Sequence, residues 1–150
     1  MSGAHIIQIF AGLMSLGVFL FITVFYNLTL SRALKKCSPA SRTMEPGLVW
    51  LLLIPLFNLI WHFLVVIALG KSLGNEIRAR GIANAEPEPG KTLGIAMCVC
   101  AACCIIPILN ILTGLAYMVL WIMYWSKIAG YSRMLDSPPV AVTPAPIQGI

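Results

Sequence analysis

The stretch from residue 6 to residue 30, IIQIFAGLMSLGVFLFITVFYNLTL, decides the fold class because its 25 residues include no charged side chain. A helix needs about 20 predominantly apolar residues to cross the hydrocarbon core of a bilayer. The stretch therefore predicts a transmembrane helix. Residues 47–70 and 92–126 also lack Asp, Glu, Lys and Arg, so the same pattern recurs twice further along the chain.

The composition of the whole chain excludes an ordinary soluble domain. Apolar residues make up 59% and charged residues only 10% of the 150 residues, and the mean hydropathy is +0.91. Soluble domains carry roughly 25% charged residues, so this chain cannot cover a water-facing surface. We expect an all-α, integral membrane helical bundle whose main partner is the lipid bilayer.

The net charge of +5 does not indicate nucleic-acid binding. The basic residues fall in the links between the apolar stretches, where lipid headgroups and the excess of Lys and Arg in cytoplasmic loops account for them. No basic stripe interleaved with aromatic residues is present, so we expect no nucleic-acid partner.

The third charge-free stretch leaves the number of spans open between four and three. As one helix its 35 residues would be roughly 52 Å long, against a hydrocarbon core of about 30 Å. A hairpin with spans at 93–106 and 108–130 is the favoured interpretation, and one long, tilted, kinked helix is the alternative. The first link joins the first two charge-free stretches, and the second link joins the second and third. Four spans with both termini inside place the second link and the C-terminus, with six basic residues, in the cytoplasm and the first link, with four, outside. Three spans with the N-terminus outside place the first link and the C-terminus inside and the second link outside, and the split is again six to four, so the excess of Lys and Arg in cytoplasmic loops does not orient the chain. We expect residues 1–136 to form the transmembrane domain and the Pro-rich residues 137–150 an extended tail.

Two segments share the pattern Ile-Pro-apolar-apolar-Asn, Ile54 to Asn58 and Ile106 to Asn110. Proline removes a backbone donor and kinks a helix, and an Asn three residues later can satisfy the freed backbone or cap the following segment. The pattern predicts Pro kinks in two membrane helices. A two-unit repeat and a coincidence in an Ile- and Leu-rich chain both remain open.

The sequences RTMEPGLVWLLLIPLFNLIWH at residues 42–62 and IMYWSKIAGY at residues 122–131 resemble uncharacterised bacterial multi-pass membrane proteins of unknown function. The resemblance covers residues 42–135. It implies a bacterial multi-helix membrane protein in which Trp50, Pro55 and Asn58 lie in one kinked span, and it implies no activity. We therefore expect the bacterial inner membrane as the location.

Polar side chains inside the apolar stretches are the candidate functional residues. His62 lies four residues after Asn58 and shares its helix face, and an ionisable group at such depth suggests a proton relay or a haem ligand. A neutral His bonded across helices is the alternative. Polar and small residues also form one stripe on the first span (Gln8, Gly12, Ser15, Phe19, Tyr26) and one on the last (Asn110, Thr113, Gly114, Tyr117, Trp121, Tyr124). The candidate helix-packing or pore-facing polar residues are Gln8, Ser15, Asn58, His62, Asn110, Thr113 and Tyr117.

Four cysteines, Cys98, Cys100, Cys103 and Cys104, occupy about two helical turns. Thiolates bind soft metals, but burial in an apolar medium disfavours the thiolate, and Cys is also a small apolar filler. We expect no metal and no cofactor here.

No phosphate-binding loop, intramembrane carboxylate pair or nucleophile-elbow pattern is present, so we expect no catalytic residue and no enzyme. The predicted function is that of an accessory or structural subunit, in a homo-oligomer or a larger membrane complex with other subunits. A small homo-oligomeric channel or transporter is the first alternative. A metal- or redox-cofactor-binding subunit that uses the cysteines is the second.

Overall fold

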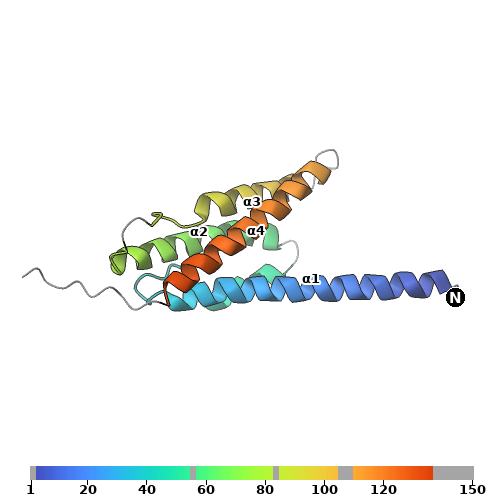
Figure 1. Cartoon of the computed structure of the whole chain (residues 1–150), viewed down its shortest axis with the longest axis horizontal. Coiled ribbons are helices and arrows are strands. Elements are labelled where there is room, and N and C mark those ends of the chain that lie inside the picture. Colours follow the sequence, from blue (N-terminus) through green and yellow to red (C-terminus); the bar gives the residue numbers. More distant parts are fainter. Residues whose placement is uncertain (1–2, 55–56, 83–84, 105–109, 137–150) are drawn as a thin grey trace, which may run out of the picture.

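The computed structural model describes residues 3–54, 57–82, 85–104 and 110–136. Within these ranges the chain forms helices and no strand, so the all-α prediction is confirmed (Figure 1). The elements are α1 (Gly3–Lys36), η1 (Pro46–Leu53, a 3₁₀ helix), α2 (Phe57–Ala79), α3 (Lys91–Cys103) and α4 (Asn110–Met134).

Three of these helices, α1, α2 and α4, are long and apolar enough to cross a membrane. The expected hairpin in the third apolar stretch is present as α3 and α4. However, the 13 residues of α3 give a length of only about 20 Å, which is shorter than the hydrocarbon core. The chain is a membrane protein with three candidate spans.

The three long helices run parallel to one another. Tyr26 contacts His62 near the start of α2, and Ser38, just past the end of α1, contacts Glu76 near the end of α2. The pairs Thr29–Trp125 and Lys36–Ser132 set α4 parallel to α1 in the same way. Parallel neighbours need return segments, and η1 and α3 provide them.

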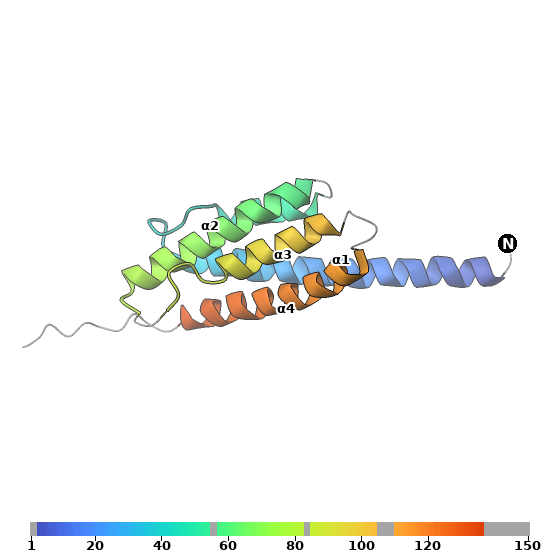
Figure 2. The same cartoon turned by 90° about the horizontal axis from the view of Figure 1, so that it is seen from above.

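Both links and the end of α4 therefore lie at the same end of the molecule (Figure 2). Ion pairs join this end: Lys36 with Asp136, Lys127 with Glu86, and Lys91 with Glu88. All ten basic and all five acidic residues of the chain belong to these links or to the neighbouring helical turns. Neither topology expected from the sequence had both links and the C-terminal segment on one side, so both are corrected here.

The single kinked span expected over residues 47–70 is replaced by two separate helices. Ile54, which precedes a proline, has φ −82° and ψ 113°, because a following proline disfavours the helical region. The 3₁₀ helix η1 therefore stops at Leu53, and α2 begins at Phe57. The prolines of both motifs, Pro55 and Pro107, lie outside the described residues, as does the predicted tail at 137–150.

Each Ile-Pro-x-x-Asn motif thus connects a short return helix to a long parallel helix. The order short helix, motif, long helix occurs twice, as η1 with α2 and as α3 with α4. The two return helices differ, since one is a 3₁₀ helix of 8 residues and the other an α-helix of 13 residues.

Small residues allow the close packing of the bundle. A Cβ on Gly94 of α3 would collide with the side chains of Val66 in α2 and Tyr124 in α4. A Cβ on Gly74 would collide with the carbonyl oxygen of Pro87 in the second link. Glycine at such contacts is typical of membrane helices, where close van der Waals packing replaces the hydrophobic driving force.

The N-terminal half of α1 extends past the other helices (Figures 1 and 2). Every residue from 3 to 22 is exposed, and these 20 residues correspond to about 30 Å of helix. The first fully covered side chains of α1 are Tyr26 and Asn27. One half of α1 therefore belongs to the bundle, and the other half has no neighbour within the described chain.

Candidate functional site

A pocket of about 190 Å³ lies where α1 leaves the bundle. Its walls come from α1, η1, α2 and α4, and three of the residues predicted as candidates, Asn58, His62 and Tyr117, line it. The remaining lining residues are Phe19, Ile22, Thr23, Tyr26, Asn27, Leu52, Met118 and Trp121. Among the residues that the structure describes, no charged side chain contributes to the wall.

A tyrosine–histidine contact forms one side of the pocket. The hydroxyl oxygen of Tyr26 lies 2.9 Å from Nε2 of His62, and both side chains are buried. The Tyr26 ring also packs against the rings of Trp121 and Trp125 on α4. The histidine is therefore bonded across helices, as the alternative interpretation of His62 describes.

Asn58 enters the pocket because it is the second residue of α2, one turn before His62. Its backbone N–H donates to the carbonyl oxygen of Ile54 at 2.9 Å, so the asparagine forms part of the helix start. Its side-chain Oδ1 is buried and accepts no hydrogen bond from the described residues.

Asn27 also lines the pocket and was not among the candidates predicted from the sequence. It lies one position past Tyr26 and so about 100° away from the stripe on which Tyr26 falls. Its side chain has no solvent exposure, and neither Nδ2 nor Oδ1 has a hydrogen-bond partner in the described part of the chain. The available signal was an amide in a charge-free membrane span, where polar side chains are rare and functional.

The other predicted residues lie apart from this pocket. Gln8 and Ser15 are exposed on the projecting half of α1. Thr113 of α4 contacts Cys104, whose sulfur lies 3.3 Å from the threonine Oγ1. Asn110 begins α4, and its side chain lies outside the described residues.

The cysteine cluster does not gather into a metal site in the described residues. Among residues 3–54, 57–82, 85–104 and 110–136, no group of three or more His, Cys, Asp or Glu side chains could hold a metal ion. Cys98 is buried against the core, whereas Cys100, Cys103 and Cys104 are half-buried.

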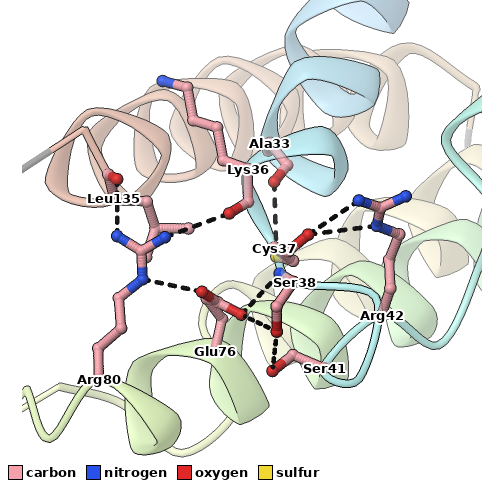
Figure 3. A network of polar contacts seen from close by, with 9 residues as sticks. All are labelled: Ala33, Lys36, Cys37, Ser38, Ser41, Arg42, Glu76, Arg80 and Leu135. Carbon is pink, nitrogen blue, oxygen red and sulfur yellow. Dashed lines mark hydrogen bonds and ion pairs between the residues drawn. The ribbon is translucent and has the colours of Figure 1, made fainter. Parts of the chain in front are cut away.

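A polar network closes the charged end of the bundle (Figure 3). Oε2 of Glu76 accepts hydrogen bonds of 2.8 Å from both the backbone N–H and the hydroxyl of Ser38. Its other oxygen accepts from Nε of Arg80 at 2.8 Å. Arg80 in turn donates to the carbonyl oxygens of Lys36 and Leu135. The network therefore ties the ends of α1, α2 and α4 together.

Cys37 lies inside this network, where its side chain is buried. Its sulfur is 3.5 Å from the Ala33 carbonyl oxygen, and the side chain is buried. Burial, with a smaller contribution from the Glu76 carboxylate, raises the pKa of the Cys37 thiol to about 11. Because the thiolate is the reactive form, the raised pKa and the burial keep the Cys37 thiol protonated at neutral pH.

The chain matches no protein-family model, no curated protein and no solved structure. The resemblance to bacterial multi-pass proteins thus stays a prediction.

Proposed function

We propose that this chain is a non-enzymatic membrane subunit, located in a bacterial inner membrane, that assembles with other membrane helices through the projecting half of α1. One observation carries the proposal: residues 3–22 are exposed over about 30 Å of helix and have no neighbouring helix within the described chain. In this role the folded bundle anchors α1, and α1 supplies the contact surface.

One face of the projecting half is suited to a helix contact. Gln8, Gly12 and Ser15 lie on the same face of α1 as Tyr26, because their spacings of 18, 14 and 11 residues are close to whole helical turns. Gly12 permits close backbone approach, and Gln8 and Ser15 can bond to a second helix. A stripe of this kind can pair with its own copy about a two-fold axis, so a second copy of this chain is the first partner to test.

Two matched glycines provide the experiment. Neither Gly12 nor Gly17 has an atom within 4 Å of where a Cβ would be, and five residues of helix place them on nearly opposite faces. We expect Gly12→Leu to reduce the oligomer measured by light scattering in mild detergent, while Gly17→Leu leaves it unchanged. Both variants should unfold at the same temperature as the wild type.

A monomeric wild type, or equal behaviour of the two variants, would contradict assembly through this face of α1. Mass spectrometry of proteins that co-purify with the wild type then distinguishes an isolated chain from a subunit of a larger complex. In that complex the Gly12→Leu variant should lose the same partners that Gly17→Leu retains.

A small homo-oligomeric channel or transporter is the second candidate function. The observation that favours it is the grouping of Asn58, His62 and Tyr117 in one membrane-embedded pocket. This function predicts conductance or substrate flux in reconstituted vesicles that is lost in Asn58→Leu and His62→Leu. A structural subunit predicts no flux in the wild type.

A further inference from the structure

The charged end of the bundle carries more basic than acidic side chains, and part of the excess is unpaired. Four of the five carboxylates form ion pairs, with Lys36, Arg80, Lys91 and Lys127. Arg42 and Arg78 donate to backbone carbonyl oxygens. The other basic side chains are exposed and have no ion pair or hydrogen bond within the described chain: Arg32, Lys35, Lys71 and Arg133. These four unpaired cations are free to bind an anion.

The four unpaired cations lie at nearly the same depth along the helix axes. The contact between Ser38 and Glu76 aligns α1 with α2, and the contact between Lys36 and Ser132 aligns α1 with α4. Counted from these contacts at 1.5 Å per residue, the backbone positions of the four residues fall within a layer about 8 Å thick. The headgroup region on each side of a bilayer is about 5–8 Å thick. With the apolar helices in the hydrocarbon core, the four cations therefore face the headgroups of one leaflet.

Arg32 and Lys35 are direct neighbours within this layer. Residues three apart on a helix have their Cβ atoms about 5–6 Å from each other, and like charges on neighbouring positions destabilise the helix. The nearby carboxylate of Asp136 pairs with Lys36 instead. An anion held between the two side chains removes this repulsion, and a phosphate group offers acceptor oxygens to the guanidinium and to the ammonium group at once.

We propose that the charged end of this chain binds an anionic phospholipid, with the lipid phosphate held between Arg32 and Lys35. A head without an ammonium group is favoured, because a zwitterionic head would bring a further cation to a surface whose cations are already in excess. Lys71 and Arg133 add to the attraction of anionic lipid into the same leaflet. This surface is independent of assembly through the projecting half of α1, because it lies at the opposite end of that helix.

The test measures lipid retention by the full-length chain in native mass spectrometry. The probes are dioleoyl phosphatidylglycerol and dioleoyl phosphatidylcholine, which share the acyl chains and the phosphate but differ in net charge. We expect preferential retention of phosphatidylglycerol, and added salt should weaken it. The double substitution Arg32→Gln with Lys35→Gln should lower the affinity for phosphatidylglycerol roughly 25-fold, since each cation near an anionic lipid surface contributes about fivefold.

The matched control keeps both charges and exchanges their carriers, as Arg32→Lys with Lys35→Arg. This variant should retain phosphatidylglycerol nearly as well as the wild type. If the double glutamine variant does not fold, Lys35→Gln alone should lower the affinity about fivefold. Equal retention of the two lipids, or unchanged retention in a folded glutamine variant, would overturn the proposal. Displacement of phosphatidylglycerol by an equal concentration of inorganic phosphate would also overturn it, because the surface would then bind free phosphate rather than a lipid.

Discussion

The hydroxyl of Tyr26 lies 2.9 Å from Nε2 of His62 and joins α1 to α2 inside the apolar part of the bundle. Tyr26→Phe removes this contact and leaves the ring nitrogen of His62 without it. We expect a destabilisation of about 1 kcal/mol, because hydrogen bonds between membrane helices contribute about 0.6 kcal/mol on average and up to about 1.7 kcal/mol.

A double-mutant cycle with Tyr26→Phe and His62→Leu measures this contribution in reversible unfolding by a denaturing detergent. The sum of the free-energy losses of the two single variants should exceed the loss of the double variant, and the difference is the coupling energy. Strictly additive losses would show that the contact contributes nothing to stability.

Glu76 is expected to be the most sensitive carboxylate of the chain. Glu76→Ala removes the acceptor for Ser38 and Arg80 at a position where the glutamate is only 5% exposed. Breaking a buried ion pair from one side typically costs 3–5 kcal/mol, so we expect a loss of about 3 kcal/mol in the same unfolding assay.

Glu88→Ala is the control for that substitution. Glu88 pairs with Lys91 three residues away at the surface, and exposed pairs of this kind contribute little. Comparable losses for the two alanine variants would mean that the Glu76 network does not hold the helix ends together.

The pair Glu86–Lys127 predicts a defined pH dependence. The hydrogen bond from Lys127 lowers the pKa of Glu86 below its ordinary value of 4.5. Since the folded state then binds the proton less readily than the unfolded state, the stabilisation is fully present above pH 4.5 and is lost as the pH falls through the folded pKa.

Lys127→Met tests this linkage. The difference in unfolding temperature between the wild type and the variant should be constant from pH 7 to about pH 5 and should shrink in more acidic buffers. A difference in unfolding temperature that does not change with pH would contradict the pairing of Glu86, in the link between α2 and α3, with Lys127 of α4.

The position of all charged residues at one end predicts the orientation in the membrane. Cytoplasmic loops are rich in Lys and Arg, so both links and the end of α4 should be cytoplasmic and residue 3 should be on the opposite side. Epitope tags placed at the N-terminus, after residue 40, after residue 84 and at the C-terminus provide the measurement. Only the N-terminal tag should be accessible in intact spheroplasts, and access to the tag after residue 84 would refute this topology.

The apolar stretches predicted the helices well because the number of apolar residues needed to cross lipid is a simple physical limit. The direction of the chain after each proline was not predictable in the same way. A return segment inside a membrane is as apolar as a span, so η1 and the start of α2 form one uninterrupted charge-free run over residues 47–70. The pre-proline residue Ile54 ends the 3₁₀ helix, and hydropathy does not register that backbone restriction.

The pocket could be predicted only in part. Helical spacing placed Asn58 and His62 on one face of α2, and both line the pocket. Asn27 and Tyr26 lie on α1, and their approach to α2 depends on the parallel arrangement of the two helices. A single sequence specifies the faces of helices, whereas the choice of which faces meet depends on tertiary packing.

The parallel arrangement of α1, α2 and α4 has an electrical consequence. Each helix carries about half a negative charge at its C-terminal end, and in an up-and-down bundle these partial charges cancel between neighbours. Here three C-terminal ends and two N-terminal ends, those of η1 and α3, meet at one face, which leaves roughly half an elementary negative charge of helix dipole uncompensated. The net charge of +5, concentrated at this same face, offsets it. Lysines and arginines that orient the chain in the membrane thus also neutralise the backbone, and removing them should weaken the fold as well as the orientation.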